Sequence, residues 1–236
     1  AKQWAALAPT MLPGKAIIHQ DNPDIGDDAP PEQAARQVLA LFAQTEADVV
    51  SISAYLIPPD DVLHTINDLS QRDVRIRALT NSLASNNHVA AHTAYRHRRK
   101  QLLEAGVELH ELRPHAPERT RFEAPGFTAE HIGLHAKILV LDKRFVFVGT
   151  LNADPRSIVL NTEVSLMIDS PELAEAILSA FSTDFTPQNS WRVVLGDNGQ
   201  LTWHSSDGVL DRQPAGSIWR RVGDFFIGLL SIDEQM

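Results

Sequence analysis

The sequence lacks several features that mark large classes of protein. It contains no cysteine, which excludes disulfide bonds and thiolate metal sites and fits a reducing compartment. It has no apolar run long enough to cross a bilayer as a helix, and it shows no signal-peptide pattern. It is short of positive charge, because 21 Lys and Arg stand against 30 Asp and Glu and leave a net charge of -9. Nucleic acid is therefore not expected as a partner, since its binding usually needs a basic surface.

The rest of the composition is that of an ordinary globular protein. The chain has 236 residues, 43% of them hydrophobic and 22% charged, which is enough for a substantial core. Strand and helix patterns alternate along it, and this predicts an α/β fold with a mixed β-sheet flanked by helices. The expected strands are 47–57, 73–80, 107–112, 136–142, 144–149 and 163–169, and the expected helices are 31–46, 60–71, 89–105 and 171–185.

Residues of reactive types gather between positions 134 and 163. His135 and Lys137 stand two apart on an expected strand, so both side chains leave it on the same face. Taken singly, each polar residue of the stretch would more often be an ordinary surface or turn residue, so only their joint spacing indicates a site. The remaining members fall at strand ends: Asp142, Gly149, Thr150, Asn152 and Glu163.

This spacing resembles the HKD signature of the phospholipase D superfamily, which reads His-x-Lys-x4-Asp-x6-Gly-[Ser/Thr]-x-Asn. Every position from His135 to Asn152 agrees, with Thr150 in the Ser/Thr position. A chance match to six constrained positions is expected in about one in a hundred thousand chains of this length. The resemblance implies a phospholipase D-like mixed β-sheet flanked by helices, in a single HKD domain.

The resemblance also implies phosphodiester chemistry through a phosphohistidine intermediate. A neutral imidazole suits this chemistry, because its pKa lies near 7 and it carries no charge toward an anionic phosphate. Lys137, Asn152 and Thr150 would bind the substrate and stabilise charge in the transition state. Glu163 would hydrogen-bond the far nitrogen of the imidazole. Asp142 completes the catalytic set, although its place at a turn favours shaping the hairpin, and the charge of lysine makes a metal or cofactor unnecessary.

The chain holds one such motif where the chemistry needs two. The leaving alkoxide requires a proton, which a second histidine across the phosphate supplies. Of the ten histidines, only His135 stands in a His-x-Lys pair. We therefore expect the second HKD half-site to come from an upstream domain or from a second copy of the chain in a symmetric dimer. In the family the second-motif histidine often serves as acid and base, and this is the role we expect for His135.

From about residue 31 onward the chain is similar to the C-terminal half of bacterial cardiolipin synthases of the C-type branch. The sequence departs from that pattern at 51–55, where the family has Ser/Thr-Pro-Tyr, and at Met236, where leucine is expected. The resemblance implies phosphatidyl transfer between anionic phospholipids, at the cytoplasmic side or periphery of a bacterial inner membrane. The segments that carry it are 51–62, 74–112, 149–168 and 217–236.

Three segments are expected along the chain. Residues 1–30, which contain an acidic Pro/Gly loop, are interpreted as a connector from an upstream half. Residues 31–186 are expected to form the phospholipase D-like catalytic domain. Residues 187–236 are expected to hold a hairpin with a type I′ turn at Asn198–Gly199, followed by an amphipathic helix.

Two other functions stay open at this point. One is a phospholipase D or nuclease-type hydrolase that acts as a one-motif homodimer, although the acidic charge argues against a nuclease. The other is a non-catalytic lipid-binding half-domain with a relic site. The intact motif argues against this second alternative.

Two further clusters invite a functional interpretation. His88, His92 and His97 share an expected helix and could face a metal, but a surface face is favoured because no acidic residue completes the ligand set. The basic run at 96–100 favours a solvated face over contact with lipid headgroups.

The amphipathic helix near the C-terminus is expected either to pack on the domain, which we favour, or to lie in a membrane interface. Its apolar positions are Ile218, Trp219, Val222, Phe225, Phe226, Leu229 and Leu230, with Arg220 and Arg221 opposite.

Overall fold

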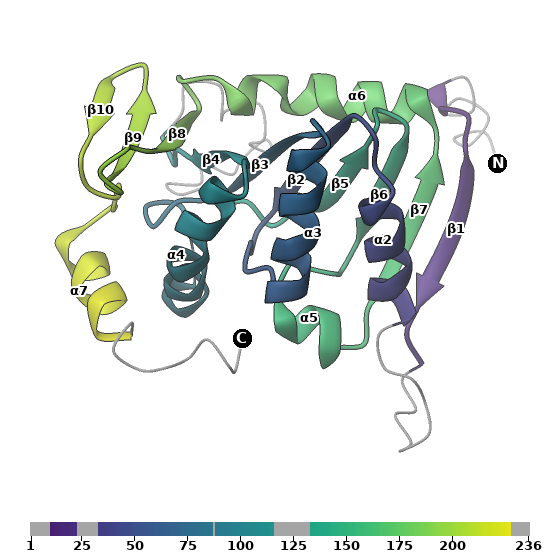
Figure 1. Ribbon diagram of the computed structural model, residues 1–236, viewed down its shortest axis with the longest axis horizontal. Helices are drawn as coiled ribbons and strands as arrows, with labels where there is room; N and C mark the ends of the chain where they lie inside the picture. The colour runs from purple at the N-terminus through teal and green to yellow at the C-terminus, as the bar shows by residue number, and fades with distance from the viewer. Residues whose placement is uncertain (1–9, 23–32, 87, 116–132, 228–236) are drawn as a thin grey trace, which may run out of the picture.

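The computed structural model describes residues 10–22, 33–86, 88–115 and 133–227, and there ten strands form one mixed sheet (Figure 1). The strand order is β1-β7-β6-β5-β2-β3-β4-β8-β9-β10, with β2, β3 and β4 parallel and all other pairs antiparallel. This confirms the predicted fold class. The strands are β1 (Lys15–Gln20), β2 (Asp48–Ser53), β3 (Arg75–Asn81), β4 (Glu108–Leu112), β5 (Lys137–Leu141), β6 (Phe145–Gly149), β7 (Val164–Asp169), β8 (Ser190–Leu195), β9 (Leu201–Ser205) and β10 (Gly208–Leu210).

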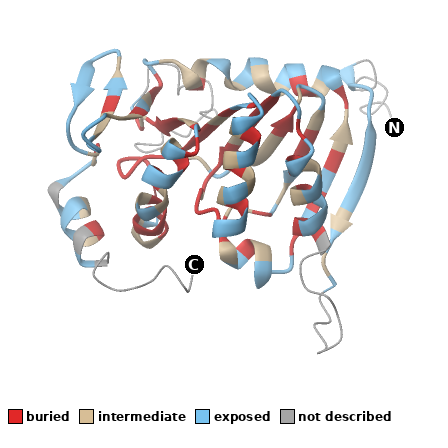
Figure 2. Cartoon of the chain, in the orientation of Figure 1, coloured by how far each residue is buried: buried red, intermediate tan, exposed pale blue. Residues whose placement is uncertain are grey.

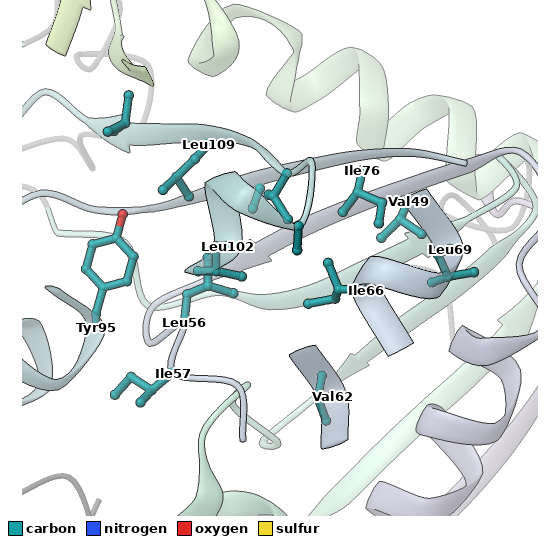
Figure 3. Close-up of a cluster of buried hydrophobic side chains, with 14 of the residues drawn as sticks. Val49, Leu56, Ile57, Val62, Ile66, Leu69, Ile76, Tyr95, Leu102 and Leu109 are labelled. Atoms are coloured by element: carbon teal, nitrogen blue, oxygen red, sulfur yellow. The ribbon is translucent and has the colours of Figure 1, made fainter. Parts of the chain in front are cut away.

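Helices cover both faces of the sheet. Since neighbouring side chains of a strand point to opposite faces, Val49 of β2 joins the core under α2–α4, while Val50 and Ile52 join the core under α6. Figure 3 shows the first of these cores, with Val62 and Ile66 of α3 facing the sheet. The helices are α2 (Gln33–Ala43), α3 (Asp60–Gln71), α4 (Val89–Glu104), α5 (Pro155–Val159), α6 (Pro171–Phe181), the 3₁₀ turn η3 (Ser182–Phe185) and α7 (Ile218–Ile227).

Strands from both the expected connector, 1–30, and the expected C-terminal hairpin belong to the same sheet. β1 pairs with β7 along its whole length, from Lys15–Asp169 to Gln20–Val164, and Figure 2 shows it as an exposed edge. β8 pairs with β4, so the expected hairpin extends the sheet at its other side. The rest of the expected connector, residues 1–9 and 23–30, lies outside the described residues.

Turn chemistry explains how several elements end. Gly106 has a φ of 88° and closes α4 as predicted, with the amide of Val107 donating to the carbonyl oxygen of Leu102 at 3.0 Å. The β5–β6 turn places Asp142 and Lys143 at positive φ, the conformation of a type I′ turn. The β8–β9 hairpin lies where the sequence placed it, but only Gly199 has a positive φ, so its turn is not type I′.

A buried ion pair joins α4 to the sheet. Arg99 and Glu111 are 2% and 0% exposed, and Nε of the arginine lies 2.8 Å from Oε1 of the glutamate. The Tyr95 hydroxyl and the Trp203 indole N–H each donate to this carboxylate at 2.9 Å. The basic run of α4 is therefore only in part the solvated face that the sequence favoured, because Lys100 is exposed while Arg99 is buried. Arg99 is the polar centre of the packing between α4, β4 and β9.

Breaking this pair should strongly destabilise the fold. We expect Arg99→Met to lower the free energy of unfolding by about 3–5 kcal/mol, because it leaves the Glu111 carboxylate buried without its ionic partner. Arg98→Met is the matched control on the same helix: Arg98 pairs with the exposed Asp60, so about 0–1 kcal/mol should be lost. Urea denaturation followed by circular dichroism measures both. Equal losses in the two variants would contradict a special role for the buried pair.

Candidate active site

The signature residues lie at one edge of the sheet. The carboxyl ends of β2, β3 and β6 and the amino ends of β5 and β7 meet there, at the lower edge in Figure 1, where α5 also lies. Lys137 is the first residue of β5, and His135 stands two residues before it. Asn152 follows β6 and Glu163 precedes β7, and these two strand ends reach the same edge. Residues separated by up to 28 positions in the sequence are thereby brought together.

The His135 imidazole and the Lys137 ammonium group are close neighbours. Nζ of Lys137 lies 3.3 Å from Nε2 and 3.4 Å from Nδ1 of the ring, and the His135 side chain is exposed. The positive charge of Lys137 lowers the pKa of His135, with smaller contributions from burial and from His88. A lower pKa favours the neutral imidazole, the form that can attack phosphorus or accept a proton.

The segment before β5 is held by a buried amide that the sequence gave no role. Asn81, 3% exposed at the end of β3, donates to the carbonyl oxygen of Leu134 and accepts from its N–H, both at 2.8 Å. The same amide donates to the carbonyl oxygen of Ala54 at 3.2 Å. These bonds fix the backbone immediately before His135. A polar residue ending an otherwise buried strand is the sequence signal that could have identified this role.

Glu163 is buried but does not contact His135 as expected. Its carboxylate accepts a short hydrogen bond from the Thr150 hydroxyl and a 3.1 Å bond from the Asn161 amide. Its negative charge acts instead on Lys137: burial lowers the pKa of this lysine, and Glu163 and then Asp154 oppose that effect. The predicted bond to the imidazole is not among these contacts, and the two carboxylate oxygens accept from Thr150 and Asn161 instead.

Asn152 and Lys137 both line an apolar cavity. The cavity measures about 110 Å³ and lies between the sheet and helices α2, α3 and α4. The amide of Asn152 donates to the Ser157 hydroxyl at 3.3 Å, while its Oδ1 atom is buried without a hydrogen-bond partner in the described part of the chain. Ser53, which pairs with Lys137 in register, lines the same space. Lys137 and Asn152 therefore border the same space.

Asp142 lies at the other end of β5, away from this cluster. Its carboxylate accepts hydrogen bonds from the backbone N–H groups of Glu46, Ala47 and Asp48, the shortest at 2.7 Å from Ala47. It stands five positions along the strand from Lys137, about 16 Å at the usual rise. These contacts agree with the expected role of Asp142 in shaping the hairpin, since its oxygens anchor the start of β2.

The motif glycine has a steric explanation. A Cβ atom at Gly149 would lie 2.5 Å from the carbonyl oxygen of Val164 and 2.8 Å from the Cα of Ser165. Only glycine, which has no side chain, lets β6 and β7 approach this closely next to the hydrogen-bonded Thr150 and Glu163.

The three helix histidines do not share one surface face. His92 is completely buried, and its pKa lies well below the ordinary value because of burial and the nearby Arg99. His88 precedes α4 and packs edge-to-face against Tyr55, whose ring in turn faces Lys137 at 5.9 Å. Among the described residues no group of three His, Asp or Glu side chains is placed to hold a metal.

Sequence comparison relates the chain to one family. A family model described as cardiolipin synthase, PLD-like domain, matches residues 38–185. Cardiolipin synthase C of Escherichia coli (strain K12) is 36% identical over 176 residues, which is 72% of this chain and 37% of that protein. Cardiolipin synthase A of Yersinia pseudotuberculosis (serotype O:1b) is 32% identical over 176 residues, 74% of this chain and 32% of that protein. The chain spans roughly a third of the length of these curated relatives.

Solved structures share the fold at low sequence identity. The phospholipase D family member Nuc from Salmonella typhimurium aligns with a TM-score of 0.52 and 16% identity, covering 75% of this chain and 99% of that one. The phosphatidylserine synthase of Haemophilus influenzae aligns with a TM-score of 0.50 and 15% identity, covering 75% and 39%. At these identities the likeness concerns the fold alone.

The coupling of Lys137 to His135 can be measured directly. We expect the pKa of His135 to lie below the ordinary 6.5 in the wild-type chain and to rise in Lys137→Met, because the substitution removes the nearby positive charge. NMR titration of the imidazole resonances gives both values, and His135→Ala assigns the signal. Lys143→Met, at the remote end of β5, should leave the pKa unchanged. A pKa that stays the same or falls in Lys137→Met would refute the coupling.

The structural role of Asp142 gives a second prediction. We expect Asp142→Ala to lower the free energy of unfolding by about 1–3 kcal/mol, because several backbone N–H groups lose their acceptor. The neighbouring Lys143→Ala should change stability by about 0.5 kcal/mol or less. Thermal and urea denaturation compare the two, and the pKa of His135 should not move in either. A shifted His135 titration in Asp142→Ala would instead tie Asp142 to the site.

Proposed function

The chain belongs to the family of cardiolipin synthase, PLD-like domains, and from this premise we propose that it transfers a phosphatidyl group between phospholipids through a phosphohistidine intermediate. One observation carries the proposal: the exposed His135 imidazole lies 3.3 Å from the Lys137 ammonium group, whose charge lowers the pKa of the imidazole and so favours release of its proton. An imidazole that gives up and takes back a proton beside a fixed positive charge suits an anionic phosphodiester and needs no metal. We propose that this chain supplies the second of two HKD half-sites.

The reaction then proceeds in two balanced steps. The nucleophilic histidine of the other half-site attacks phosphorus, and the bond from phosphorus to the leaving alcohol oxygen breaks. His135, first protonated, donates its proton to that oxygen. In the second step neutral His135 removes the proton from the acceptor hydroxyl, whose oxygen attacks phosphorus while the bond from phosphorus to nitrogen breaks. Both imidazoles return to their starting states, and water in place of the lipid hydroxyl would give hydrolysis.

The groups around His135 support this division of labour. Lys137 and Asn152 border the same space and would bind the non-bridging oxygens of the phosphate. Glu163 acts as a positioning residue, because it favours the charged form of Lys137 against the effect of burial. Thr150 is exposed, donates a hydrogen bond to Glu163 and would also contact the substrate.

A surface for the other half-site is available on the sheet. Ile18, Leu166 and Val148 form one cross-strand row over β1, β7 and β6, and they are 64%, 38% and 37% exposed. The row lies on the face that α6 covers elsewhere, beyond the reach of that helix. An uncovered apolar row next to an incomplete site suits contact with an upstream domain or a second copy.

The test is phosphatidyl transfer with vesicles containing phosphatidylglycerol, with the mass of the chain in solution measured in parallel. We expect His135→Ala to lower turnover by about 10²- to 10⁴-fold, the usual contribution of a general acid–base group. His204→Ala, on β9, is the matched control and should retain activity.

The outcomes separate the possible partners. Activity from a dimer assigns the second half-site to another copy, and activity restored by an upstream half assigns it to that domain. Release of the free headgroup and phosphatidic acid, without transfer, would replace transfer by hydrolysis. Full activity in His135→Ala would remove this residue from the mechanism.

A further inference from the structure

Among the described side chains of helix α7, charged ones pack on the protein and apolar ones are exposed. Helical spacing puts Trp219, Val222 and Phe226 on one side, because they are three and four residues apart. Arg220 and Asp224, four apart, share another side. In a typical surface helix the apolar side would face the core, as we favoured from the sequence. Here the arrangement is reversed.

The charged side of α7 is bound by many polar contacts. The Arg220 guanidinium donates to the carbonyl oxygens of Leu83, Ala84 and Asn86 at 2.9, 3.2 and 2.8 Å. The Asp224 carboxylate is 1% exposed and accepts hydrogen bonds from the side chains of α4 and the preceding loop. These donors are Thr93 at 2.8 Å, Arg96 at 3.1 Å and Gln213 at 2.8 Å. Such a set of contacts fixes the rotation of the helix about its axis.

The apolar side of α7 faces outward as a result. Trp219 is 79% exposed, Phe226 61% and Val222 40%. Figure 2 shows much of the helix in pale blue. Large aromatic side chains gathered on one exposed face of a helix mark a surface that is covered in the working state of the protein.

The position of α7 links it to the site. The carbonyl groups that Arg220 binds belong to the loop after β3, and that loop begins directly after Asn81. Asn81 holds Leu134, the residue before His135. In Figure 1 α7 and α5 both lie toward the lower edge of the molecule, where the strand ends carry the signature residues.

We propose that the Trp219–Val222–Phe226 face of α7 rests in the interface of a lipid bilayer and presents the active edge to its substrates. Tryptophan and phenylalanine suit the boundary between headgroups and acyl chains, and an amphipathic helix of this kind lies about 5–10 Å deep there. Arg221, exposed and bonded only to the carbonyl oxygen of Gln213 among the described groups, adds positive charge beside the face. The inference rests on the proposed function in naming lipid as the occupant.

The basic run of α4 does not compete for this role. Arg96 pairs with Asp224, Arg98 with Asp60, and Arg99 with the buried Glu111. These cations serve contacts within the protein. Within the described residues, no helix is both long enough and apolar enough to span a membrane.

Partition of the chain between buffer and vesicles tests the proposal. The vesicles are equimolar phosphatidylglycerol and phosphatidylcholine, and the variant is Trp219→Ser/Phe226→Ser. We expect its partition coefficient to fall at least about tenfold, since two large apolar side chains no longer leave water. Val209→Ser/Leu210→Ser is the matched control, because these β10 side chains are 59% and 43% exposed at another place, and it should partition like the wild type.

A second measurement keeps the test valid if the double variant folds poorly. The tryptophan emission of the wild-type chain should shift to shorter wavelength on vesicles and be quenched by lipids brominated along their acyl chains. Trp219→Phe should abolish most of this response while preserving partition. A response that persists in Trp219→Phe would overturn the proposed orientation.

Three other results would overturn the proposal itself. The first is that the wild-type chain does not partition to vesicles, and the second is that the two double variants partition equally. The third is a wild-type dimer that becomes a monomer in Trp219→Ser/Phe226→Ser, which would mean that a second copy of the chain covers this face. Partition does not require turnover, and His135→Ala should partition like the wild type. Failure of lipid binding and failure of the proposed reaction are thus separate results.

Discussion

The hydrogen bonds between the Asn81 amide and the backbone of Leu134 are the constraint on which the site depends. The side chain of Asn81 bonds the backbone N–H and C=O of Leu134 as a neighbouring strand would, and so holds the segment before β5 at the end of the parallel strands. The backbone after His135 is held in turn by the bond from the Ala54 N–H to the carbonyl oxygen of Ala136. Because Asn81 is buried, its bonds do not compete with water, and the position of the imidazole is set by the core.

Electrostatics at this edge divides the charged groups between two tasks. The charge of Lys137 lowers the pKa of the neighbouring imidazole, and the charge of Glu163 opposes the effect of burial on the pKa of Lys137. Asp142, although part of the same signature, binds the backbone at the far end of the strand. One motif spacing can therefore combine residues proposed for chemistry with residues that hold the strands carrying them. Only their hydrogen-bond partners tell the two kinds apart.

Local patterns made the sheet, its helices and the clustered motif predictable, because a spacing of two residues fixes a face of a strand and Gly106 fixes a helix end. Contacts between segments far apart in the sequence were harder to predict. The pairing of β1 with β7 depends on segments over a hundred residues apart, and the burial of Arg99 depends on Glu111 and Trp203 from other strands. The two faces of α7 could be seen in the sequence, but which one docks is decided by carbonyl groups of a distant loop. The hydrogen bond from Thr150 to Glu163 was not predicted, because it depends on how β6 and β7 pair.

The cavity that Lys137 lines has a consequence for the groups that can enter it. The space measures about 110 Å³ and is partly open, so water and not vacuum can fill it. Its walls are almost entirely apolar side chains, which hold such water only weakly. An apolar group that entered beside Lys137 and Asn152 would displace this water at little cost, and burial of apolar surface would favour its entry.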